Sequence, residues 1–128
     1  MTIDSNLTIS FSSILEEKAF LFAEEAVRLR YNLKSQREYH VADQFFRSAT
    51  SVGANIAEAN EAESRADFIH KLKIASKELN ESFFWMNLLK RAEIPIDLNE
   101  ALSRAFVVKK ILSKSISTAT KNKYSQTK

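Results

Sequence analysis

The sequence contains no cysteine, a single glycine and a single proline among its 128 residues. Without cysteine, neither a disulfide framework nor a thiolate metal site can form, and a reducing cytoplasm is the natural compartment. β-Rich and loop-rich domains need many glycines and prolines for their turns, so this scarcity predicts few, long elements. The N-terminus lacks a basic and apolar leader, and no apolar run reaches the roughly 18 residues of a membrane span. We therefore expect a cytoplasmic protein with no membrane partner.

Helical periodicity dominates what is present. Apolar residues recur every three or four positions along four segments, 13–34, 39–62, 65–93 and 98–119, and this spacing places them on one helix face. The seam of the first segment consists of Leu15, Ala19, Phe22, Ala26, Leu29 and Leu33. The seam of the third consists of Phe68, Leu72, Ala75, Leu79, Phe83 and Met86. The pattern predicts an all-α, antiparallel up-and-down four-helix bundle over residues 13–120, with an N-terminal tail (1–12) and a basic C-terminal tail (121–128).

Two of these helices also carry apolar side chains outside their seams. A helix that is apolar on most sides must be covered on most sides, and clustered exposed aromatic residues mark interfaces. We therefore expect a homo-oligomer. The alternative is that the N-terminal tail covers the side chains of the third helix with Ile9 and Phe11. The expected interface residues are Phe20, Val27 and Tyr31 in the first helix and Phe84, Trp85 and Leu88 in the third.

Charge is distributed unevenly along the chain. Residues 101–128 contain seven Lys and Arg residues and no acid, giving +7, so residues 1–100 carry −4 of the net +3. This asymmetry favours a polyanionic partner, RNA or DNA, held by electrostatic contacts to phosphates; ordinary solvated helix faces are the alternative. The expected phosphate contacts are Lys73, Lys77, Lys110, Lys114 and Lys121, with Arg104, Lys109 and Lys123 as secondary candidates.

No residue pattern indicates a catalytic or metal centre, so we expect a protein that is not an enzyme and holds no metal or cofactor. Paired Glu-x-x-His motifs of di-metal bundles are absent. One enzymatic alternative is the spacing of Arg65 and His70, which resembles the Arg-x4-His ribonuclease motif of HEPN domains. In that family a polar residue usually follows the arginine and the motif lies in a late helix. Here Ala66 follows it, and the pair opens the third helix.

A broader resemblance involves segments 45–59, FFRSATSVGANIAEA, and 64–72, SRADFIHKL. They resemble the four-helix-bundle proteins encoded within intervening sequences of bacterial 23S ribosomal RNA genes, over roughly residues 13–118. The resemblance implies a homopentamer without enzymatic activity, and some relatives are nucleic-acid-binding accessory proteins of diversity-generating retroelements. The other non-enzymatic possibility is an interaction scaffold whose basic surface binds an acidic nucleic-acid-processing protein.

The residues that carry the resemblance could form a site or support the fold. Their spacing favours support, because they lie where the second helix ends and the third begins, and polar side chains there can satisfy free backbone groups. These signature residues are Asn55, Glu58, Ser64, Asp67 and Phe68.

Overall fold

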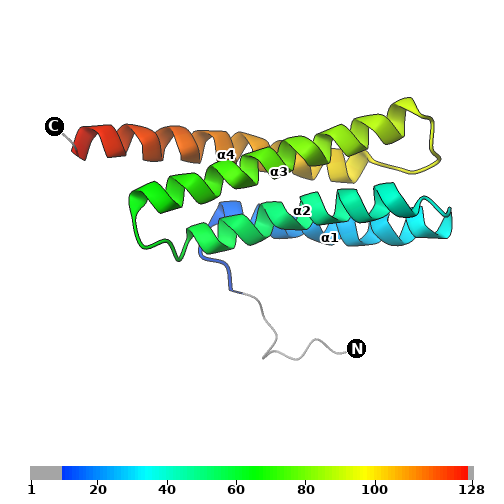
Figure 1. The fold of residues 1–128 in the computed structure, drawn as a ribbon, viewed down its shortest axis with the longest axis horizontal. Coiled ribbons are helices and arrows are strands. Elements are labelled where there is room, and N and C mark those ends of the chain that lie inside the picture. The colour runs from blue at the N-terminus through cyan, green and yellow to red at the C-terminus, as the bar shows by residue number, and fades with distance from the viewer. Residues whose placement is uncertain (1–9, 127–128) are drawn as a thin grey trace.

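The computed structural model describes residues 10–126, and the side chains of residues 10–122, as an antiparallel bundle of four helices (Figure 1). Each helix contacts its two neighbours in the cycle α1–α2–α3–α4, and the diagonal pairs α1–α3 and α2–α4 are not in contact within the described residues. The predicted all-helical architecture is thus confirmed, and no helix in this part of the chain is long and apolar enough to span a bilayer. The helices are α1 (Ile14–Ser35), α2 (Tyr39–Ala59), α3 (Arg65–Arg91) and α4 (Asn99–Gln126).

Serine caps begin two of the helices. The Oγ of Ser13 accepts a hydrogen bond from the backbone N–H of Glu16 at 3.1 Å, and the Oγ of Ser64 accepts one from Asp67 N–H at 3.0 Å. Each cap satisfies one of the backbone donors that a helix N-terminus leaves unpaired. These two serines therefore fix where α1 and α3 start.

Two helices end in left-handed residues that are not glycine. Arg37 after α1 has a φ of 65°, and Glu93 after α3 has a φ of 59°. In both turns the next backbone N–H donates to a carbonyl five residues back, at 2.9 Å and 3.1 Å, which is a Schellman ending. Because a side chain in this conformation costs about 1 kcal/mol, both turns carry strain that a glycine would relieve.

Two helix boundaries differ from the sequence-based expectation. Helix α2 ends at Ala59 rather than at residue 62, because Ser64 must adopt an extended backbone, with a φ of −147°, to cap α3. Helix α4 continues to Gln126 instead of ending near residue 119. No glycine or proline occurs after Pro95 to stop it. The residues expected to form a basic tail are therefore helical as far as the structure describes them.

The core lies along the bundle axis. All six seam residues of α1 are buried, as predicted. In α3 the prediction was partly wrong, because Phe68 and Phe83 are only half-buried, whereas Ile69, Ser82 and Leu89 are buried. The errors arise where two adjacent residues are both apolar, as Phe68 and Ile69 are, and where the buried residue is polar, as Ser82 is beside Phe83.

A pair of serine hydroxyls joins α2 to α3 inside this core. Ser48 and Ser82 are both fully buried, and their Oγ atoms lie 2.9 Å apart. Ser48 also reaches the carbonyl of Phe45, and Ser82 that of Glu78, each at 3.0 Å. Buried polar groups need such partners, and the small side chains let the two helices approach closely.

Candidate nucleic-acid interface

A row of lysines follows the outer face of α4. Lys110, Lys114 and Lys121 are exposed and, at 1.5 Å per residue, extend over roughly 16 Å of the helix. None of the three forms a salt bridge within the described residues, and α4 carries no acidic residue after Glu100. Their charges are therefore available to an anionic partner.

The secondary candidates on α4 are differently placed. The Nε of Arg104 donates to the carboxylate of Glu100 at 2.8 Å, so its charge is already balanced. The ammonium group of Lys109 lies 5.5 Å from the ring centre of Phe83, where the ring face attracts it. Lys123 belongs to α4, but its side chain lies outside the described part.

Helix α3 brings two further lysines to the same half of the bundle. Lys73 and Lys77 lie one turn apart and are exposed. The tilted rings of Phe83 and Phe106, with centres 4.9 Å apart, mark the antiparallel register of α3 against α4. Counting residues from that contact, Lys77 and Lys73 lie level with positions near 112 and 116 of α4. The structure thus places the five main candidate lysines on two neighbouring helices, from the middle of the bundle toward the start of α3.

Cations on the other helices are largely paired. Arg30 and Lys34 both contact the carboxylate of Asp43, at 3.2 and 3.1 Å, and these hydrogen bonds, that of Lys34 foremost, hold the pKa of Asp43 below its ordinary value. Helix α2 carries two acids and one arginine, whereas α4 carries six basic residues and one acid. The bundle therefore has a strongly basic side at α4 and a weakly acidic side at α2.

The arginine of α2 is held in an acidic cluster. Arg47 contacts the carboxylates of Glu78, at 3.1 Å, and of Glu81. The indole N–H of Trp85 donates to Glu81 at 3.1 Å. The indole hydrogen bond and then Arg47 lower the pKa of Glu81, because both stabilise the ionised carboxylate. This cluster ties α2 to α3.

The expected interface residues of α3 differ in how far they are exposed. Phe84 is 57% exposed and Leu88 46% exposed. Trp85 is half-buried and lies edge-on to Phe84, with ring centres 5.1 Å apart. Its ring packs against the core and lies edge-on to His40, 6.2 Å between ring centres.

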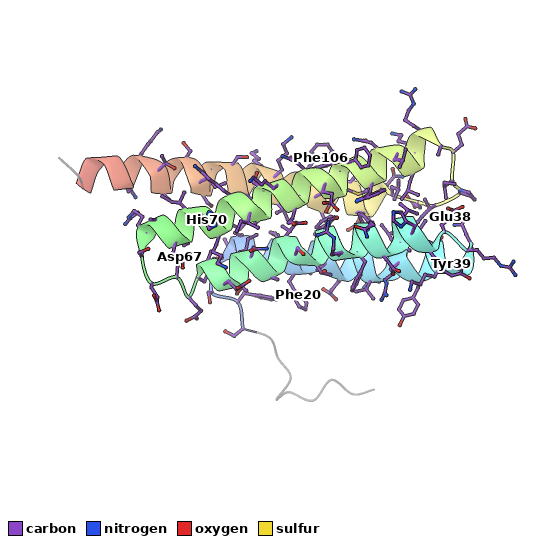
Figure 2. All side chains as sticks on the ribbon, viewed as in Figure 1. Phe20, Glu38, Tyr39, Asp67, His70 and Phe106 are labelled. Carbon is purple, nitrogen blue, oxygen red and sulfur yellow. The ribbon has the colours of Figure 1, made fainter. Side chains whose placement is uncertain are left out.

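The expected interface residues of α1 all face solvent. Phe20, Val27 and Tyr31 are 37%, 40% and 75% exposed. Phe11 packs on Phe20, with ring centres 5.3 Å apart, so the described part of the N-terminal tail reaches the α1 patch and not α3. Ile9, the other tail residue considered, lies outside the described residues. Figure 2 shows Phe20 and Phe106 on opposite sides of the bundle; Phe106, 58% exposed, lies off the α4 seam and was not anticipated as a surface aromatic.

The signature residues support the fold in a way the sequence only partly predicts. Ser64 caps α3 as expected. Asn55, expected at the α2–α3 corner, instead donates to the Ser51 carbonyl one turn back at 2.8 Å, because its side chain points along its own helix. Glu58 contacts the ammonium group of Lys71 at 3.4 Å and so links α2 to α3.

Arg65 and His70, the pair considered for ribonuclease chemistry, do not converge. Both are exposed on α3, and a separation of five residues turns them roughly 140° apart around the helix. Figure 2 shows His70 and Asp67 on the first turns of α3. A joint reaction centre would therefore need groups from another molecule.

A groove lies where α4 passes the starts of α1 and α3, with a volume of about 680 Å³. Arg65 and Phe68 of α3 line it together with Lys110 and Lys114 of α4. Two lysines of the α4 row thus border this groove, which the sequence did not predict. We call it the end groove.

Comparisons with known proteins place this bundle in a family. The chain matches none of the curated proteins. It is similar to the crystal structure of a protein of unknown function from the S23 ribosomal protein family of Bacteroides thetaiotaomicron, with 41% identity and a TM-score of 0.75, over 80% of this chain and 98% of that one. The family model described as 23S rRNA-intervening sequence protein matches residues 12–121. The chain therefore belongs to the family of 23S rRNA-intervening sequence proteins.

Proposed function

We propose that this protein is a non-enzymatic homopentamer that binds RNA or DNA electrostatically through the basic side formed by α3 and α4. The observation that carries the proposal is the set of exposed lysines on adjacent helices that form no salt bridge within the described residues, beside α4, the helix with a single acidic residue. Lysines neutralise phosphates and release counterions, so such binding depends steeply on salt and little on sequence.

The two apolar patches support the assembly. One lies on α1 and the other on α3, which are diagonal helices of the bundle. A two-fold dimer needs one self-complementary patch, whereas two different patches on opposite sides suit a head-to-tail contact that closes into a ring. The number five is the assembly that the family resemblance implies. Such a ring leaves the lysine row of α4 free and multiplies it by its copies. Lys77, about two helical turns from Phe84 on the same face of α3, borders the contact instead.

Light scattering coupled to size-exclusion chromatography tests both parts of this proposal. We expect the mass of five protomers and co-elution with a short fluorescent oligonucleotide at low salt, lost at high salt. A monomer would refute the assembly. A pentamer that ignores both RNA and DNA at low salt would refute the binding and leave an interaction scaffold.

A charge-matched pair of variants locates the binding surface. Lys110→Gln, Lys114→Gln and Lys121→Gln together remove three charges from the α4 row, and each lost phosphate contact should reduce the salt slope by about 0.9. The control removes three charges at the other end of the bundle, with Arg28→Gln, Lys34→Gln and Arg37→Gln. Equal losses of affinity in the two variants would show that net charge, and not the α4 row, governs binding.

A control for nuclease activity belongs in the same experiment. Because Arg65 and His70 do not converge, we expect the labelled RNA to stay intact. Degradation that disappears in His70→Ala would contradict the non-enzymatic proposal and favour the ribonuclease alternative.

A further inference from the structure

The end groove exists because the helices differ in where they stop. Helix α4 continues past the first turn of α3, as its projecting end in Figure 1 shows. Among the described residues, Ile14 of α1 and Arg65 and Phe68 of α3 line the groove opposite the last turns of α4. The resulting volume of about 680 Å³ is in the range of sites that hold small organic groups.

The lining combines an apolar floor with a cationic rim. Phe68 and Ile111 are half-buried and form part of the floor. The rim of the groove is formed by three exposed cations, Arg65, Lys110 and Lys114. They form no salt bridge within the described residues. No acidic side chain lines the groove. A ligand that fits must therefore be anionic and must also present an apolar face.

The residues of α4 that line the groove also include side chains that can form hydrogen bonds with a ligand. Thr118 and Asn122 line the groove one turn apart. A threonine hydroxyl and an asparagine amide each donate and accept hydrogen bonds. An acyl chain would leave these groups unpaired against its methylenes, whereas a nucleobase offers donors and acceptors on its edge and a flat apolar face.

These features discriminate between single and double strands. In a duplex the base faces are stacked, so a duplex could use the cationic rim but could not fill the floor. An unpaired nucleotide can use both, with its phosphates on the rim and its base against the aromatic ring. Resting on the proposed function, we infer that the end groove seats an unpaired nucleobase, with Phe68 as the stacking surface and Asn122 as an edge-reading contact, so that this protein prefers single-stranded to double-stranded nucleic acid.

The experiment compares two strands that differ only in their bases. Fluorescence anisotropy at one fixed salt concentration measures the affinity of the full-length protein for oligo(dT) and for an abasic strand of equal length. Base stacking on an aromatic residue contributes about 1–3 kcal/mol, which converts to roughly 5-fold to 150-fold in affinity. We expect oligo(dT) to bind more tightly than the abasic strand by a factor in this range.

Two variants test the named residues. Phe68→Leu keeps an apolar side chain in the floor but removes the aromatic face, and Asn122→Ala removes the amide at an exposed position where folding is not at risk. Both should lower the ratio of oligo(dT) to abasic affinity and leave abasic binding and its salt slope unchanged. Phe83→Leu, a half-buried α3 phenylalanine away from the groove, is the control and should keep the wild-type ratio.

The outcomes separate this inference from the proposed function. Equal affinity for the two strands, or a ratio that neither Phe68→Leu nor Asn122→Ala changes, overturns the groove assignment while electrostatic binding still stands. Absence of binding to every strand at low salt refutes the proposed function itself. Dodecanoate that binds the groove and is not displaced by oligo(dT) would overturn the assignment in favour of an anionic amphiphile.

Discussion

Replacing the chain's single glycine should stabilise the protein. Gly53 lies in the interior of α2 and faces Ala19 of α1; a methyl group built on it would lie 3.7 Å from the Ala19 carbonyl oxygen and 3.8 Å from its Cβ. Both distances are ordinary van der Waals contacts. Since glycine in a helix interior costs about 1 kcal/mol relative to alanine, Gly53→Ala should raise the free energy of unfolding by about 1 kcal/mol.

Urea unfolding followed by circular dichroism measures this change. A gain of that size corresponds to a rise of about 3–5 °C in the thermal midpoint for a domain of this length. The protomer concentration must be kept constant, because self-association makes apparent stability depend on it. The matched control is Ala54→Gly, at the next and exposed position of α2, which should lose about 1 kcal/mol.

A loss of stability in Gly53→Ala, together with the expected loss in Ala54→Gly, would refute this reasoning. That result would show that α1 and α2 approach too closely for a methyl group, in which case the glycine is required by packing. From the sequence alone, a close approach of two helices is one plausible reason for a glycine inside a helix, and a tolerated glycine with no packing role is the other. The structure shows the close approach but leaves room for one carbon.

Three further predictions concern the joins between helices. Glu93→Gly should raise the thermal midpoint by relieving the left-handed residue after α3, a gain of about 1 kcal/mol, and an unchanged midpoint would contradict the strain. Ser48→Ala and Ser82→Ala should each cost about 1 kcal/mol in urea unfolding, and the double variant should cost less than the two together; full additivity would show that the hydroxyls are not coupled. The pKa of Glu81 is lowered in the folded protein, so its carboxylate stabilises the fold at pH values above the ordinary glutamate pKa, and this stabilisation is lost as the pH falls through the lowered pKa. The thermal midpoint of Glu81→Gln should therefore depend less on pH below about 5 than that of the wild type.

Much of the fold could be predicted because each helix repeats a simple spacing. The α1 seam is correct at every position, from Leu15 to Leu33. Helix α3 is predicted less well, since it buries Ile69 in place of the adjacent Phe68 and the polar Ser82 in place of Phe83. Apolar spacing cannot decide which of two adjacent apolar residues is buried, and it does not mark a buried polar residue; both choices depend on how the neighbouring helices pack.

The candidate site, too, could be predicted only in part from the sequence. The lysine row of α4 is visible in the sequence because its members share one helix face. The half-buried position of Trp85 could not be predicted in this way, because it depends on a hydrogen bond to Glu81 and on a contact with His40 from another helix. The end groove escaped prediction because the sequence placed the end of α4 near residue 119, and an overhang formed by three chain segments has no local signal.

The lysine row should destabilise the proposed ring by electrostatic repulsion, and the last prediction concerns this effect. Each protomer contributes a surplus of five positive charges on α4, and neighbours in a ring bring these like charges together. Salt screens such repulsion over a distance of about 8 Å at physiological ionic strength. Salt should therefore strengthen the assembly while it weakens nucleic-acid binding.

Dilution series followed by light scattering can separate these opposite effects. At low salt we expect the pentamer to dissociate at a higher protomer concentration than at high salt. A short oligonucleotide added at low salt should restore the pentamer, since a ligand that binds only the assembled form stabilises that form. The variant that lacks Lys110, Lys114 and Lys121 should lose most of this dependence. An assembly that falls apart as salt rises would mean that ion pairs, and not the apolar patches of α1 and α3, hold the protomers together.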